Sequence, residues 1–174
     1  MSTDIVDKDL KALRNGRWDK AFIKEAGDSR ADERAKVNRK ATIVIEHIIQ
    51  ASDISHTMQH WHVYLKWNRR LFEEIYVAYL NGRVEKDPSE FWYKGEFGFF
   101  DFYIIPLTKK LKECGVFGVS SGEYLSYAMK NREQWETDGE QVCATMIEKA
   151  RKKYGVKGSD GRLMQMLEQA RDAP

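Results

Sequence analysis

A stripe of large apolar side chains between residues 61 and 79 limits most strongly what this chain can fold into. The stripe follows the 3.6-residue period of one helix face and ends at Asn81-Gly82, a helix-stop pair. It consists of Trp61, Tyr64, Leu65, Asn68, Phe72, Ile75, Tyr76 and Tyr79. Only three prolines occur in 174 residues, and no alternating runs meet at a hairpin turn. We therefore predict one all-α, compact multi-helix domain.

Weaker signals place the other helices. We expect a helix over 4–14 that stops at Asn15-Gly16 and a second over 18–25. The polar stretch 29–40 is interpreted as a loop or a solvated helix start before an apolar helix over 41–52. Gly95 and Gly98 suggest a loop that leads into a helix, which Pro106 should kink.

The C-terminal third shows a similar pattern. Ser120 with Glu123 three residues later indicates an N-cap, and the helix that it begins should extend toward Tyr154. Residues 155–161 are interpreted as a linker, and 162–171 as a peripheral helix. The expected organisation is a domain over 1–154 followed by a linker and peripheral helix over 155–174.

The charge balance and cysteine content exclude several classes of function. A formal charge of +2, with no isolated basic block, gives no support for nucleic-acid binding. The two cysteines lack C-x-x-C spacing, which favours a reducing compartment. The chain shows no signal peptide at its start, and its longest apolar stretch, 97–107, is too short to cross a bilayer. We expect a cytoplasmic protein without a membrane segment.

All four histidines fall within sixteen positions, and Asp53 lies among them. If one continuous helix spans this region, Asp53, His56 and His60 occupy a single face at i, i+3 and i+7. A carboxylate and two imidazoles at that spacing are suitable ligands for a divalent metal. The alternative is that the imidazoles pack against neighbours or face solvent.

Aromatic and polar residues also concentrate after the central loop. The group consists of Phe91, Trp92, Tyr93, Glu96, Phe97, Phe99, Phe100, Phe102 and Tyr103. Such a density can form a slot that stacks a flat base, with one polar side chain at the edge of the base. Aromatic residues at helical spacing are also typical of an ordinary core, so both interpretations stand.

Three motif-like segments follow one another along the chain. Residues 51–55, ASDIS, are similar to A-D-x-S, and Trp67 follows fourteen residues after Asp53. Residues 67–75, WNRRLFEEI, are similar to W-x-x-R-(I/L)-x-E-E-(F/Y). Residues 95–101, GEFGFFD, followed by Pro106-Leu107, are similar to S-Q-x-G-F-(I/L)-D and a Pro-Leu step. In this order, and with a weaker match at Thr3-Asp4-Ile5 before them, the segments resemble the class I 3',5'-cyclic-nucleotide phosphodiesterases.

The resemblance implies a fold and a set of roles. The fold would be the C-terminal portion of a phosphodiesterase-type, HD-like helical domain, which hydrolyses cAMP or cGMP to the 5'-nucleotide with two divalent ions, zinc and magnesium or manganese. Asp53 would be a zinc ligand. The cyclic nucleotide would contact Glu96 at the purine edge, Phe99 by stacking, His56, and an apolar wall of Trp67, Leu71 and Ile75.

The chain departs from the family at three points. Glu96 replaces a glutamine and His56 replaces an asparagine, and both changes affect base recognition, so cAMP and cGMP are not distinguished. The histidine motifs that supply the other metal ligands and the general acid should precede Thr3 and are not in this chain. We therefore expect no catalytic residue within it and no activity alone, whether it is a fragment, a truncated product or a degenerate paralogue.

Two other functions remain alternatives. The first is a non-catalytic nucleotide-binding or interaction module that has kept the base pocket. The second is a helical scaffold with a chance histidine cluster, which three motifs in the correct order make less favourable.

Overall fold

The computed structural model describes residues 8–23 and 30–156, and these ranges contain helices and loops but no strand. The all-α prediction is confirmed. The helices are α1 (Lys8–Trp18), α2 (Arg30–Asp53), α3 (Trp61–Leu80), α4 (Trp92–Phe99), α5 (Ile105–Glu113) and α6 (Ser120–Tyr154). Two π-helical turns, Asp19–Ile23 and Phe100–Ile104, and two 3-10 turns, Ser55–Met58 and Pro88–Glu90, join them. None of the helices in these ranges is both long and apolar enough to cross a membrane.

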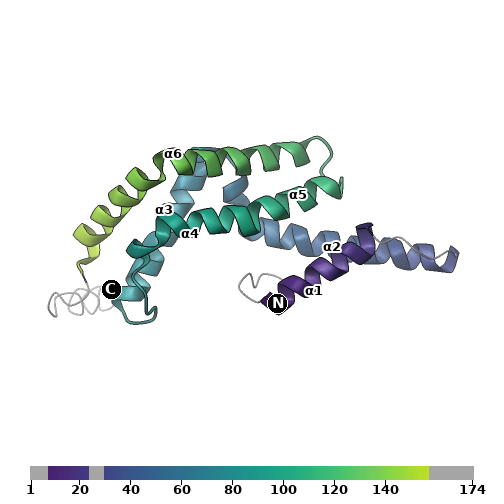
Figure 1. Cartoon of the computed structure of the whole chain (residues 1–174), viewed down its shortest axis with the longest axis horizontal. Helices are drawn as coiled ribbons and strands as arrows, with labels where there is room; N and C mark the ends of the chain where they lie inside the picture. Colours follow the sequence, from purple (N-terminus) through teal and green to yellow (C-terminus); the bar gives the residue numbers. More distant parts are fainter. Residues whose placement is uncertain (1–7, 24–29, 157–174) are drawn as a thin grey trace, which may run out of the picture.

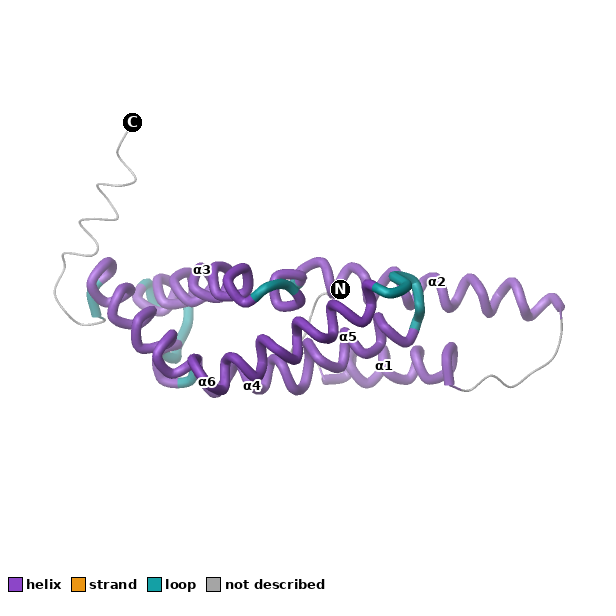
Figure 2. Tube along the Cα trace, turned by 90° about the horizontal axis from the view of Figure 1, so that it is seen from above, coloured by secondary structure: helices purple, strands orange, loops and turns teal. Residues whose placement is uncertain are grey.

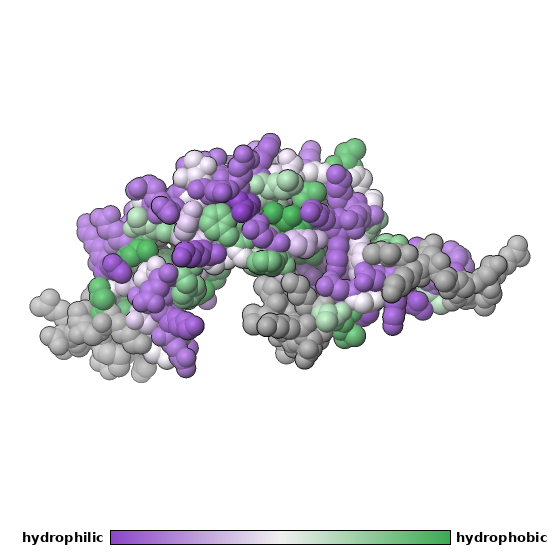
Figure 3. Space-filling view, in the orientation of Figure 1, coloured by the Kyte–Doolittle hydropathy of each residue, from purple (hydrophilic) through white to green (hydrophobic). Residues whose placement is uncertain are grey.

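The helices form an elongated arch in which α6 runs back alongside α4 and α5 (Figure 1). Seen from above, α2 and α3 follow one another along one side, and α4, α5 and α6 lie along the other (Figure 2). Helix α6 packs against α3, α4 and α5 and so holds the two sides together. The underside of the arch is hollowed, and green apolar patches interrupt the hydrophilic surface of the face shown in Figure 3.

The predicted stripe on α3 is the centre of the core. Tyr64, Asn68, Phe72 and Tyr76 are buried at successive turns of the helix, as the spacing required. They meet Phe100 and Trp135, whose side chains are fully buried. The helix ends at Leu80, and Gly82 adopts a positive φ of 72°, which only glycine adopts without strain.

Three of the boundary predictions are wrong. Asn15 and Gly16 lie inside α1, where Lys110 donates a 2.7 Å hydrogen bond to Asn15 and the buried Trp18 anchors the next turn. Gly95 and Gly98 lie inside α4 rather than in a loop. Tertiary packing of the neighbouring aromatic residues therefore outweighs the low helix propensity of glycine.

The third error concerns the start of α6. Val119 occupies the N-cap position without a side-chain cap, and Ser120 is already helical. The long helix itself is confirmed, since α6 passes through Gly139 and ends at Tyr154. The expected peripheral helix over 162–171, the match at Thr3-Asp4-Ile5 and the start of the first predicted helix lie outside the described residues.

The predicted kink at Pro106 coincides with a change of helical register. The N–H of Ile105 donates to the carbonyl of Phe100, five residues earlier, which is the π-helical pattern. Proline has no N–H, so the carbonyl four residues before it loses its usual donor and the preceding turn adjusts. This π-helical turn lies between Phe99 and Pro106, within the segment that carries the candidate site.

Candidate functional site

The structure places the candidate residues on four neighbouring elements. Asp53 is the last residue of α2 and exposes its carboxylate, and His56 lies in the 3-10 turn that follows. Trp67, Leu71 and Ile75 lie one turn apart along α3. Glu96 and Phe99 lie three residues apart on α4.

The predicted metal-binding face on one helix is wrong. Helix α2 ends at Asp53, and Gln59 is extended, so His60 becomes the N-cap residue of α3. Its Nε2 lies 3.1 Å from the hydroxyl of Tyr127. Within 8–23 and 30–156, no group of three His, Cys, Asp or Glu side chains is placed to hold a metal ion.

His47 is a core residue rather than a metal ligand. Its ring is 4% exposed and packs 4.9 Å from that of Trp18. Its Nδ1 lies 2.7 Å from the carbonyl oxygen of Ile43, and since a carbonyl only accepts, Nδ1 carries the proton and donates. Burial is the largest cause that lowers the pKa of His47, so its neutral form is favoured.

Tyr103 packs against Phe99. The rings of Tyr103 and Phe99 stack with centroids 5.7 Å apart and planes within 9°. Burial raises the pKa of Tyr103, the charge of Arg14 lowers it, and the negative charge of Asp53 raises it further. Tyr103 also borders a cavity of about 260 Å³ between α1, α2 and α5.

A second contact joins His56 to α3. The imidazole of His56 and the indole of Trp67 lie 6.3 Å apart, and the guanidinium of Arg70 lies over the indole at 4.9 Å. Burial lowers the pKa of His56. Trp67 and Leu71 are 45% and 43% exposed, which leaves their apolar surface open to a ligand or to another part of a protein.

Glu96 is buried, and its carboxylate is bound within the core. The hydroxyl of Tyr64 donates to Oε2 of Glu96 at 2.6 Å, and the amide of Asn68 donates to the Tyr64 oxygen at 3.3 Å. The indole N–H of Trp92 donates to Oδ1 of Asn68 at 3.2 Å. Because an indole N–H can only donate, the donors in this series of hydrogen bonds run in one direction, from Trp92 through Asn68 and Tyr64 to Glu96.

Burial raises the pKa of Glu96 to about 7, although the hydrogen bonds from Tyr64 and Asn68 act in the opposite direction. Desolvation therefore outweighs the two donors, and the carboxyl group changes its charge near neutral pH. The same charge contributes to the raised pKa of Cys143 on α6, after the burial of that thiol.

Sequence reasoning missed three residues that contact the candidate residues or extend their hydrogen bonds. Tyr64 and Asn68 were assigned only to the apolar stripe, and Tyr103 only to the aromatic group. Asn68 was the available signal, because an amide within an apolar helix face requires a polar partner.

The candidate residues lie on a helical framework of α2, α3 and α4. A family model described as 3'5'-cyclic nucleotide phosphodiesterase matches residues 8–116, which include every candidate residue above. The chain belongs to this family. No curated protein and no solved structure matches it significantly.

Proposed function

We propose that this chain is the base-binding part of a cyclic-nucleotide phosphodiesterase domain and that it acts in the cytoplasm. Phe99 would stack on the purine, and Trp67, Leu71 and Ile75 would form the apolar wall. One observation supports the proposal: Phe99 stacks on Tyr103, whose pKa is raised by burial and, to a smaller extent, by the negative charge of Asp53.

Base recognition would depend on two residues that differ from the family pattern. A neutral His56 offers one donor and one acceptor, as the amide of an asparagine does. Tyr64 donates to Oε2 of Glu96, and Asn68 also bonds to this buried carboxyl group, so a base would have to compete with these core donors for it. An ionised Oε1 accepts from an exocyclic amino group, and a protonated one donates to a ring nitrogen or carbonyl.

The described residues do not by themselves fit a two-metal centre. Asp53 is a suitable hard ligand for one divalent ion, but no group of three metal-ligating side chains surrounds it within 8–23 and 30–156. Hydrolysis would therefore require further ligands, which in this family come from histidine motifs in an upstream segment.

Nucleotide binding is the direct test. The 174-residue chain is titrated with cAMP and with cGMP in the presence of a chelator, and binding is followed by calorimetry. We expect saturable binding that Phe99→Ala removes. Phe91→Ala is the matched control, because Phe91 is an exposed aromatic residue near the opposite end of the α4 segment. Equal affinity in the Phe99→Ala and parent proteins would contradict the proposal.

A non-catalytic nucleotide-binding module is the second candidate, favoured by the single carboxylate that this site contributes. The two candidates differ in what an upstream segment would restore. An in-frame sequence before Met1 that encodes the histidine motifs, and metal-dependent hydrolysis by the joined protein, would establish the enzyme. Nucleotide binding without hydrolysis by the joined protein would establish the module.

A further inference from the structure

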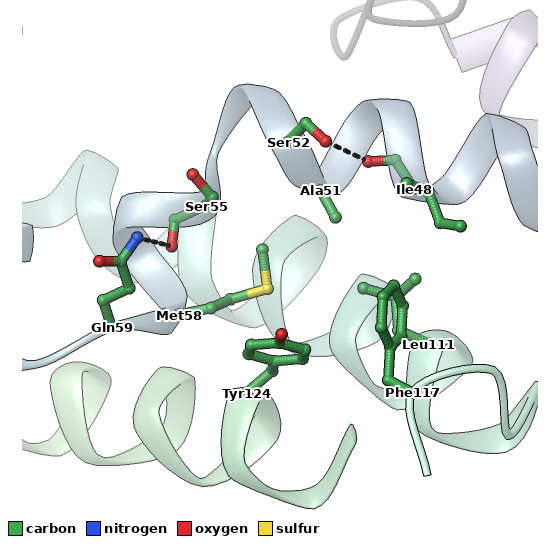
Figure 4. Close-up of a pocket in the computed structure, with 9 residues that line it drawn as sticks. All are labelled: Ile48, Ala51, Ser52, Ser55, Met58, Gln59, Leu111, Phe117 and Tyr124. Carbon is green, nitrogen blue, oxygen red and sulfur yellow. Dashed lines mark hydrogen bonds between the residues drawn. The ribbon is translucent and has the colours of Figure 1, made fainter. Parts of the chain in front are cut away.

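A second cavity lies away from the candidate site, between the end of α2, the turn 55–58, the end of α5 and the start of α6 (Figure 4). Its volume is about 410 Å³, which is within the range of small-molecule sites. Ile48, Ala51 and Ser52 contribute one face of α2 to it. The helical period places Asp53 on nearly the opposite side of α2, so this cavity and the candidate site are separate.

The walls of this cavity are apolar and uncharged. They come mainly from Ile48, Ala51, Met58, Leu111 and Phe117. In Figure 4 the Ala51 methyl group and the Met58 thioether lie above the ring of Tyr124. Among the residues that the structure describes, no Lys, Arg, His, Asp or Glu lines the cavity. A charged ligand would lose its hydration without gaining a partner, so the lining selects for an uncharged one.

Two of the polar groups in the lining already use their donors within the chain. The Ser52 hydroxyl donates to the carbonyl of Ile48 at 2.8 Å, and the amide of Gln59 donates to the carbonyl of Ser55 at 3.2 Å. The Tyr124 ring packs edge-on against Phe117, with centroids 5.7 Å apart, which fixes its position. Its hydroxyl faces the cavity and can bind a single polar group of a ligand (Figure 4).

We propose that this cavity binds a small, uncharged and largely apolar molecule, such as a fused-ring compound, with the Tyr124 hydroxyl as its polar contact. Ser52, Ser55 and Met58, which line this cavity, flank Asp53 and His56 in the sequence. A ligand in the cavity would therefore contact the segment that carries those two residues. The proposal is independent of nucleotide binding, because it uses none of the residues assigned to the base.

The test uses 2-naphthol as the probe and the whole 174-residue chain at neutral pH. We expect saturable one-to-one binding, with NMR shifts concentrated at Ala51, Met58 and Tyr124. Naphthalene-2-sulfonate has the same rings with a charge and should bind at least about tenfold more weakly. Tyr124→Phe keeps the ring and removes the hydroxyl, and should weaken naphthol binding roughly fivefold.

Ala51→Phe fills the cavity and should abolish naphthol binding. Val37→Phe adds the same side chain at an exposed position on the same helix and should leave binding unchanged. Absence of saturable binding to the parent chain, equal binding of the sulfonate, or unchanged binding by a folded Ala51→Phe protein would overturn the proposal. So would a dimer that Ala51→Phe dissociates, since it would make a second copy the occupant.

Discussion

The hydroxyl of Tyr64 and Oε2 of Glu96 lie 2.6 Å apart in the core and link α3 to α4, although the two residues are 32 positions apart in the sequence. A carboxyl group in such a place is unusual, because buried acids are expensive unless they are neutral or well paired. The pairing with Tyr64 is therefore central to both the stability and the proposed base recognition of this protein.

The first prediction concerns Glu96 and pH. The pKa of its carboxyl group is about 7 in the folded chain, against an ordinary value of 4.5. The unfolded chain thus releases a proton that the folded chain keeps, so the free energy of unfolding falls as pH rises from about 4.5 to about 7 and then levels off. The full loss is about 3 kcal/mol from this one group.

Glu96→Gln removes that loss, because an amide does not ionise. We expect its free energy of unfolding to exceed that of the parent at about pH 8 and to match it more closely at about pH 5. Urea unfolding of both proteins at the two pH values measures this. Glu133→Gln, at an exposed site on α6, is the control and should leave the pH dependence unchanged. An equal shift in both variants would contradict the assignment to Glu96.

The second prediction concerns Tyr64. Tyr64→Phe leaves the Oε2 of Glu96 and the amide of Asn68 without their partner in the core. We expect a loss of about 1–3 kcal/mol in the free energy of unfolding, larger when Glu96 is ionised. Tyr127→Phe removes a comparable hydroxyl from an exposed contact with His60 and should cost about 0.5 kcal/mol or less. A small loss in both variants would show that the buried contact contributes little.

The third prediction concerns Gly139, which is buried against two aromatic rings. A Cβ at this position would lie 2.9 Å from both Trp135 and Tyr93. Gly139→Ala should therefore lower the free energy of unfolding by about 1–3 kcal/mol, although alanine is the better helix former.

Gly122→Ala is the matched variant in the same helix, because a Cβ there has no neighbour within 4 Å. It should raise the free energy of unfolding by up to about 1 kcal/mol. Thermal and urea unfolding of the two variants give the comparison. Stabilisation by both changes would show that the rings beside Gly139 move aside readily.

The fourth prediction concerns Asp53. Its carboxylate lies at the C-terminal end of α2, where a negative charge interacts unfavourably with the helix dipole. Asp53→Ala should therefore leave helicity and stability unchanged within about 1 kcal/mol. In the protein joined to an upstream segment with the histidine motifs, the same change should remove hydrolysis and weaken metal retention, with Asp53→Asn between the two. A metal-replete, active Asp53→Ala protein would refute the ligand assignment.

Helical periodicity was sufficient to predict the elements that carry most of the core. The α3 stripe predicted the buried positions Tyr64, Phe72 and Tyr76, and Asn81-Gly82 predicted where the helix ends. Elsewhere the positions of glycine residues did not predict helix ends. Gly16, Gly95 and Gly98 each lie within a helix, because contacts made by residues beside them in space, which a local pattern does not contain, hold those turns in place.

The candidate site was only partly predictable. The family motifs led to Asp53, Glu96 and Phe99, but the direction of the Glu96 carboxyl group depends on a partner on another helix. Tyr103 lies in the π-helical turn and stacks on Phe99, and no local sequence rule predicts such a turn reliably. The histidine spacing wrongly suggested one shared helix face for Asp53, His56 and His60, because α2 ends at Asp53 and a 3-10 turn follows.

The segment that matches the family model is shorter than the segment that forms the hydrophobic core, and helix α6 makes the difference. The family match ends at residue 116, yet α6 supplies the core with Ala128, Trp135, Cys143, Met146 and Ala150. A polypeptide cut at the end of the match would keep every residue assigned to the cyclic nucleotide but would lose Tyr124 and the helix against which α3, α4 and α5 pack. Truncations of this protein should therefore retain α6 through Tyr154, beyond the last residue that the family model matches.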